Sequence, residues 1–104
     1  MEIDENTLKE LQNYQQQLTN ILSQKEMFKL QLLESEKALG ELKKTSEREC
    51  FVVIGNVFIK KSVEEVKKQL EEEIEILNIK IKSLENSEGK IREKLKELER
   101  KLKS

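Results

Sequence analysis

The sequence predicts a mostly α-helical fold: a long antiparallel two-helix coiled coil with a β-hairpin at its centre. Both flanks of the chain repeat apolar residues at the three- and four-residue spacing of coiled coils. An almost uncharged stretch, residues 50–59 (CFVVIGNVFI), separates the flanks in a chain that is 39% charged. With 104 residues, one Tyr, three Phe and 36% hydrophobic content, the chain cannot build a large globular core.

The first helix is expected over about residues 5–44. Its ladder of alternating three- and four-residue steps is apolar except at two positions, which indicates a stripe that packs on a partner helix. The ladder positions are Leu11, Tyr14, Leu18, Ile21, Lys25, Phe28, Leu32, Ser35, Leu39 and Leu42.

The second helix is expected over about residues 63–103. Ser62 and Glu65 form a capping-box pattern at its start, because the Ser hydroxyl can accept a hydrogen bond from a free backbone N–H of the first turn. Its ladder is again apolar except at two positions. The ladder positions are Val63, Lys67, Leu70, Ile74, Leu77, Ile81, Leu84, Glu88, Ile91, Leu95, Leu98 and Leu102.

Charge favours an antiparallel pairing of these helices. Residues 1–20 are net acidic and residues 90–104 are net basic, so folding the chain back brings opposite charges together. Each rod would be roughly 60 Å long, with both free ends at one tip. Residues 86–89 (NSEG) are weak helix formers, and counting from the helix ends places them opposite Thr19 and Asn20. A flexible point is predicted there, with tolerated sequence drift as the alternative.

The central stretch reads as a β-hairpin over about residues 50–60. Gly55-Asn56 is a two-residue turn signal compatible with a type II′ turn, and it would pair Ile54 with Val57 and Val53 with Phe58. Both faces of this hairpin are apolar, and an isolated two-stranded hairpin is marginal in water. We expect it to join other subunits, with packing on its own coiled coil as the alternative. The expected oligomerisation residues are Phe51, Val52, Val53, Ile54, Gly55, Val57, Phe58 and Ile59.

Residue content argues against an enzyme, a metal site or a cofactor. The chain has no histidine, the commonest general base and metal ligand. Its single cysteine, Cys50, permits no intramolecular disulfide and is interpreted as a small buried hydrophobe. Residues 55–62 (GNVFIKKS) echo a phosphate-binding loop, but Lys60 stands where the second Gly is required. No catalytic residues are therefore expected.

The first residues, MEIDENTL, are acidic and lack the apolar segment of a signal peptide. No apolar run approaches the roughly 18 residues of a membrane span. A cytoplasmic protein without membrane contact is expected.

At the level of motifs, the chain resembles the β-type subunit of prefoldin over nearly its whole length. The resemblance lies in residues 14–18 (YQQQL), residues 34–42 (ESEKALGEL), the hairpin 51–60 (FVVIGNVFIK) and the heptads that follow. The chain departs from the family at Val52, where a Lys is common, and in a shorter linker before the hairpin.

This resemblance implies a hetero-hexamer of two α-type and four β-type subunits, with hairpins assembled into β-barrels and coiled coils as tentacles. It implies an ATP-independent chaperone, a holdase, that captures unfolded client proteins at the coiled-coil tips and delivers them to a group II chaperonin.

Client capture requires exposed apolar surface kept soluble by surrounding charge. Ile3 and Leu8 lie outside the ladder and are the better candidates, whereas the ladder leucines of the tip could simply close the coiled coil. The predicted client-binding residues are Ile3, Leu8, Leu11, Leu95, Leu98 and Leu102.

Two rival functions belong to other classes. A structural tether or oligomerisation rod would need the helices but not the tips. A nucleic-acid binder would use the basic residues 90–104, but the acidic neighbouring helix and the absence of interleaved aromatic residues argue against it. No nucleic-acid partner is therefore expected.

Overall fold

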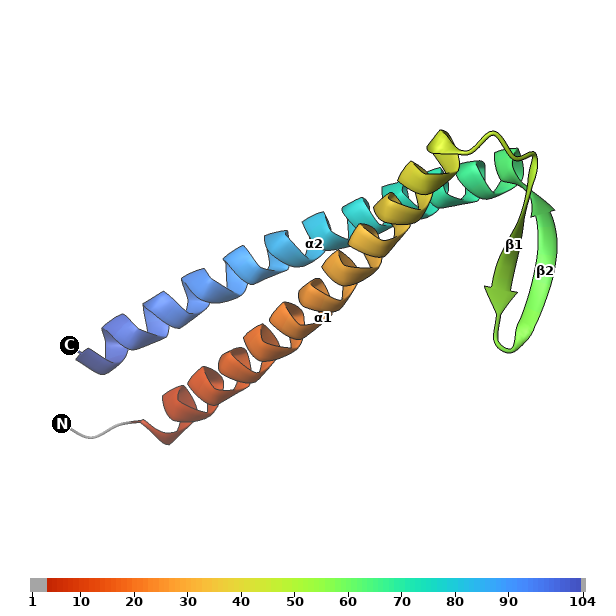
Figure 1. Cartoon of the computed structure of the whole chain (residues 1–104). Helices are drawn as coiled ribbons and strands as arrows, with labels where there is room; N and C mark the ends of the chain where they lie inside the picture. Colours follow the sequence, from red (N-terminus) through yellow and green to blue (C-terminus); the bar gives the residue numbers. More distant parts are fainter. Residues whose placement is uncertain (1–3, 104) are drawn as a thin grey trace. The chain divides into compact units, whose positions relative to one another are not determined.

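Two long helices joined through an antiparallel β-hairpin make up the computed structural model, which describes residues 4–103 (Figure 1). Helix α1 is Glu5–Lys44 and helix α2 is Val63–Lys103. Strand β1 is Glu49–Ile54 and strand β2 is Val57–Ser62. The predicted fold class is confirmed, because two heptad-patterned flanks form helices and the uncharged centre forms the hairpin.

Two compact units share these elements. The helix-end unit contains the described residues 4–28 and 80–103, and the hairpin unit contains residues 29–79. Each unit therefore holds a segment of both helices. The organisation of residues 1–104 as one domain stays a prediction.

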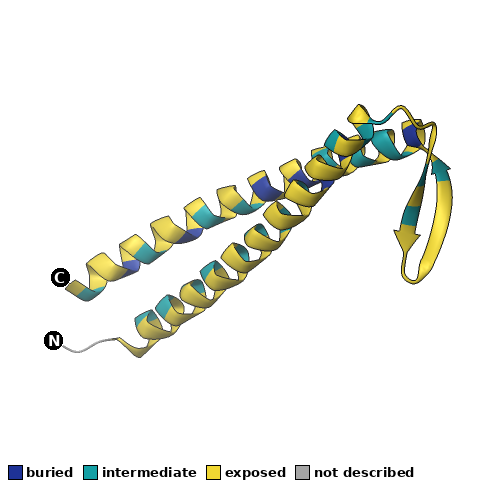
Figure 2. Cartoon of the chain, viewed as in Figure 1, coloured by how far each residue is buried: buried dark blue, intermediate teal, exposed yellow. Residues whose placement is uncertain are grey.

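In the helix-end unit, the two helix segments run antiparallel. Lys25 Nζ lies 2.6 Å from Glu88 Oε1, and Lys80 Nζ lies 5.3 Å from the centre of the Phe28 ring. Residue numbers therefore decrease along α2 in the direction in which they increase along α1, as in an antiparallel pair. Every predicted ladder position of this unit is buried or half-buried, and these positions form the bands along the helices in Figure 2. The buried members are Ile81, Ile91 and Leu98.

Asp4 starts α1 as its N-cap, a role that the sequence analysis did not assign. Its Oδ1 accepts a hydrogen bond from Asn6 N at 3.0 Å, and its Oδ2 accepts one from the Thr7 hydroxyl at 3.3 Å. Its carbonyl oxygen accepts the first helical bond, from Leu8 N. The carboxylate thus satisfies a backbone donor that the helix itself leaves free.

The hairpin unit has a small core in which Ser35, Leu39, Val63 and Leu77 are buried. The cap predicted for α2 is present, because Ser62 Oγ accepts a hydrogen bond from Glu65 N at 3.1 Å. Val63 N donates to the carbonyl oxygen of Arg48 at 2.9 Å, which ties the linker before β1 to the start of α2. These bonds hold both ends of the hairpin at the base of the helix.

The hairpin has the predicted register. Ile54 pairs with Val57, Val53 with Phe58, and Val52 with Ile59. Gly55 has φ +61°, and none of the described non-glycine residues has a positive φ. A positive φ at the first turn position alone is the property of a type II′ turn, which makes glycine the required residue there.

Gly55→Ala is expected to destabilise the hairpin, whereas Gly89→Ala is expected to stabilise α2. A methyl group at either position would meet no atom within 4 Å, so sterics do not separate them. Alanine at the positive φ of residue 55 costs about 1–2 kcal/mol, while alanine in the helix gains about 1 kcal/mol. Hydrogen exchange of the β1 and β2 amides and of the α2 amides measures both changes. If the two alanine substitutions changed stability in the same direction, the type II′ turn assignment at Gly55 would be contradicted.

The register inferred from the helix ends was wrong for the side chain of Glu88, which contacts Lys25 and not Thr19 or Asn20. Helical side chains lean toward the N-terminus of their own helix, so in an antiparallel pair the two contacting residues lean in opposite directions. Counting along backbones ignores this lean. Helix α2 continues through residues 86–89 without a break, and their flexibility stays a prediction.

Candidate functional site

The hairpin carries the largest set of exposed apolar side chains in the hairpin unit. Phe51 is 67% exposed and Phe58 is 71% exposed, which is unusual for aromatic residues in a folded chain. The exposed set also includes Val53, Ile54, Val57 and Ile59. Of the predicted oligomerisation residues, Val52 is half-buried and the others are exposed. The chain by itself leaves this surface open to water.

Strand alternation distributes these residues over both faces of the sheet. The observed register places Val52, Ile54, Val57 and Ile59 on one face, and Phe51, Val53 and Phe58 on the other. Lys60 Nζ forms an ion pair with Glu49 Oε2 at 3.3 Å, but both side chains are more than half exposed, so this pair adds little stability. A two-stranded sheet with two uncovered apolar faces and two open edges needs partners.

At the helix ends, the predicted client-binding residues differ in exposure. Leu8 is 38% exposed, whereas Leu98 is 4% exposed and belongs to the seam. Leu11, Leu95 and Leu102 are half-buried. Ile3 lies outside the described residues. The structure therefore brings one freely exposed candidate and four seam residues into the helix-end unit, and their role in client binding stays a prediction.

Leu95 also lines an open pocket of about 220 Å³ on the helix-end unit. The other lining residues, Arg92, Lys96 and Glu99, carry charges of both signs. Apolar surface flanked by charge can contact an apolar segment while the surroundings stay hydrated. Through this pocket the half-buried Leu95 can be reached from outside the seam.

A charged layer lies within the same seam. The Lys25 and Glu88 side chains are 17% and 16% exposed, and Arg92 Nε donates a second hydrogen bond to Glu88 Oε2 at 2.9 Å. The hydrogen bonds from Lys25 and then Arg92 hold the pKa of Glu88 below its ordinary value, against the opposing effect of partial burial. Glu88 therefore stays ionised in the folded unit.

The stability that Glu88 contributes is expected to disappear in acid. Its pKa is lower in the folded than in the unfolded chain, so this stability is fully present above the unfolded value of 4.5 and is lost as the pH falls through the folded value. The difference in thermal midpoint between the wild type and Glu88→Gln should therefore be smaller at about pH 3 than at neutral pH. An unchanged difference would contradict the assignment.

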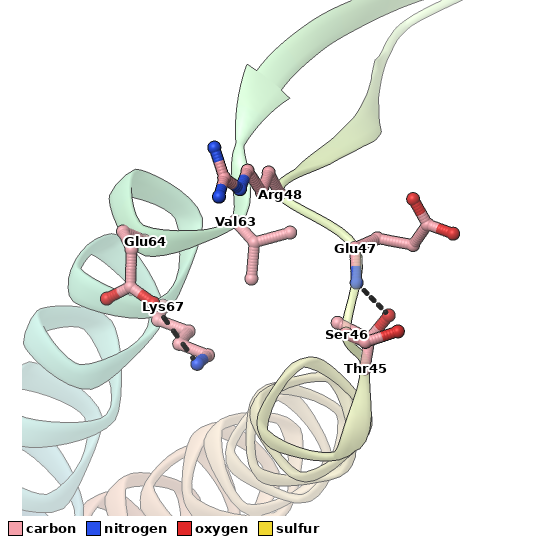
Figure 3. A pocket seen from close by; sticks show the side chains of 7 residues that line it. All are labelled: Thr45, Ser46, Glu47, Arg48, Val63, Glu64 and Lys67. Carbon is pink, nitrogen blue, oxygen red and sulfur yellow. Dashed lines mark hydrogen bonds and ion pairs between the residues drawn. The ribbon is translucent and has the colours of Figure 1, made fainter.

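A second open pocket, of about 450 Å³, lies where residues 45–48 pass the start of α2 (Figure 3). Thr45 Oγ1 accepts a hydrogen bond from Glu47 N at 3.2 Å, and Lys67 Nζ lies 3.4 Å from Glu64 Oε1. The hydroxyls of Thr45 and Ser46 have no histidine to activate them, because the chain contains none. The pocket follows from the sharp connection between α1 and the hairpin.

Among the described residues 4–103, no group of three or more Asp, Glu or Cys side chains is arranged to hold a metal ion. Neither α1 nor α2 has an apolar stretch that could cross a membrane.

Comparison with known proteins decides the family. The sequence profile of the family described as "Prefoldin subunit" matches residues 5–104. This chain belongs to the prefoldin family. The prefoldin beta subunit of Thermococcus onnurineus is 36% identical over 96 residues, which cover 91% of this chain and 83% of that protein. The prefoldin beta subunit of Archaeoglobus fulgidus is 36% identical over 99 residues, covering 94% of this chain and 85% of that protein.

The fold agrees with the family. The crystal structure of the prefoldin beta subunit from Thermococcus strain KS-1 matches with a TM-score of 0.83 and 34% sequence identity, covering 92% of this chain and 85% of that one. The predicted resemblance to β-type prefoldin is thus confirmed. The chain has the role of a prefoldin chaperone subunit, which is favoured over the structural tether. As a family of subunits, prefoldin implies assembly with other subunits of its kind.

Proposed function

We propose that this chain is the β-type subunit of a cytoplasmic hetero-hexamer that holds unfolded proteins without ATP and passes them to a group II chaperonin. Four copies would assemble with two α-type subunits, and the hairpins would form the intersubunit β-barrels. The protein would work by binding alone, as a non-enzyme without nucleic-acid or membrane partners.

The exposed apolar hairpin is the observation that carries the assembly part of this proposal. Fully burying a Val, Ile or Phe side chain gains about 1.5–3 kcal/mol, so covering several of them in a shared sheet provides a large driving force. The open edges of β1 and β2 can accept strands from neighbouring subunits through backbone hydrogen bonds.

The helix ends support the client-holding part. The start of α1 and the end of α2 belong to one unit, in which Leu8 is exposed and charged side chains line the pocket beside Leu95. An unfolded protein exposes scattered apolar side chains, and several weak apolar contacts from different tips would add up to useful affinity. Contacts of this kind require no nucleotide.

Co-expression with an α-type prefoldin subunit tests the proposal. Light scattering should give the mass of a hexamer, and the purified complex should suppress aggregation of a chemically unfolded protein without ATP. Adding a group II chaperonin with ATP should then recover folded client. A monomer or dimer that holds no client would contradict the proposal, and holding that depends on ATP would contradict its mechanism.

A further inference from the structure

A single charged layer interrupts the seam of the helix-end unit. At every other ladder position of this unit the residue is apolar or aromatic. The ladder steps are the same above and below Lys25 and Glu88. Apolar packing alone therefore does not distinguish the observed alignment from one in which α2 slides by a heptad.

The Lys25–Glu88 contact exists only in the observed alignment, whereas Arg92 stands one turn from Glu88 on α2 and stays beside it in any alignment. Lys25 Nζ lies 2.6 Å from Glu88 Oε1, and Arg92 Nε lies 2.9 Å from Glu88 Oε2, so both carboxylate oxygens have partners. About five-sixths of the Lys25 and Glu88 side-chain surfaces are withdrawn from water. A mostly buried charge needs such a partner, because removing one member leaves the other uncompensated.

Sliding one helix by a heptad separates the two charges. Counting by the ladder steps, the slide sets Lys25 against Ile81 and Glu88 against Leu18. Lys25 would then face an apolar side chain without a partner, and Glu88 would keep Arg92 alone. Polar seam residues of this kind fix the register of coiled coils at a cost in stability relative to an apolar pair.

We propose that the Lys25–Glu88 pair sets the alignment of α1 and α2 in the helix-end unit and acts as a positioning device for the helix ends. The lean of these two side chains and the contact of Lys80 with Phe28 together set the backbone of Leu18 opposite that of Ile91, and Leu11 opposite Leu98. The charged layer makes the unit less stable than an apolar layer would, but it favours a single alignment of the two helices. This inference goes beyond the proposed function and does not depend on client binding.

Disulfide trapping in the full chain, with Cys50→Ser as background, tests the alignment. The pair L18C/I91C reports the observed alignment, and the pair L11C/I91C reports a slide of one heptad. Intrachain disulfides are separated from interchain ones by mass. The disulfides are compared in three proteins: one with the native layer, one with the apolar layer K25L/E88L, and one with the exchanged layer K25E/E88K. The exchanged protein also carries R92Q, because the positive charge of Arg92 would repel the lysine introduced at position 88.

With the native layer, the aligned disulfide should form and the slid one should not. In K25L/E88L the ratio of aligned to slid disulfide should fall at least about tenfold, while the thermal midpoint stays equal or rises. The exchanged layer should restore the native ratio. These two measurements separate positioning from stabilisation, because replacing a pair that only stabilised the protein would lower the thermal midpoint without changing the disulfide ratio.

An unchanged ratio in K25L/E88L would overturn the proposal, since the connection through the hairpin would then fix the alignment alone. The proposal would also be overturned if the exchanged protein stayed helical but did not recover the native ratio of aligned to slid disulfide. If K25L/E88L loses its helicity, K25Q/E88Q replaces it, and the same ratio decides the question.

Discussion

Removal of residues 1–10 together with 97–104 is expected to abolish the suppression of aggregation while leaving the assembled complex intact. The deletion takes away four of the six residues proposed to bind clients, namely Ile3, Leu8, Leu98 and Leu102. It spares the hairpin and the Lys25–Glu88 pair. Light scattering of the client measures holding, and light scattering of the complex measures its mass. Retained holding by an intact complex would place the client site elsewhere.

Point variants separate client contact from seam closure. Leu8→Gln should weaken holding with little change in thermal stability, because Leu8 is 38% exposed and lies outside the ladder. Leu22→Gln is the matched control: Leu22 is 37% exposed on the same helix but stands farther from its end. Equal loss of holding in both variants would show that exposed leucines act without regard to position.

Leu98→Ala is expected to behave differently from both. Leu98 is buried at 4% exposure, so truncating it leaves a cavity in the seam and costs about 2–5 kcal/mol of stability. Any loss of holding in this variant should follow the loss of helix pairing, and both should recover at lower temperature. The contrast with Leu8→Gln tests whether the seam leucines bind clients directly.

Local sequence signals were sufficient to predict the elements and the hairpin register. Gly55-Asn56 fixes a two-residue turn, and once the turn is fixed the pairing of Val53 with Phe58 follows without further information. Likewise, Ser62 marks the start of α2 because its hydroxyl acts within one helical turn. Such signals need only neighbouring residues, so a single sequence contains them.

Contacts between the helices depend on more than neighbouring residues. Lys25 and Glu88 were both recognised as polar exceptions in their ladders, but their pairing depends on the lean of side chains across the seam. Matching the charged exceptions of opposite sign would have found the pair. The Asp4 cap could have been predicted from the sequence, because a helix that begins at about residue 5 leaves Asp4 at the N-cap position and Asp is a preferred residue there.

Client-binding residues are the least predictable part of the site. Leu11, Leu95 and Leu102 obey the ladder pattern, and a half-buried leucine serves a seam and a binding surface equally well. A seam residue and a client-binding residue differ in whether the side chain contacts a bound client protein. Exposure in the single chain therefore separates Leu8 from the seam but assigns no role to the seam residues.

Phe58→Glu is expected to prevent assembly while leaving the helices of the single chain unchanged. Phe58 is 71% exposed, so its replacement removes no core contact in the chain itself. In an intersubunit sheet, however, the carboxylate would be buried without a partner, which costs several kcal/mol at each copy. The α-type subunit and this chain, co-expressed and sized by light scattering, should then stay below the mass of a hexamer, with unchanged helical circular dichroism.

Ile79→Glu is the matched control for this experiment, because Ile79 is 63% exposed and apolar but lies on α2, outside the hairpin. The same charge placed there should leave the hexamer intact, since glutamate is well tolerated in helices. If Phe58→Glu assembled normally, the hairpin would have to be covered by its own chain. If Ile79→Glu disrupted the complex equally, the subunit interface would extend along α2, and the hairpin would be only one part of it.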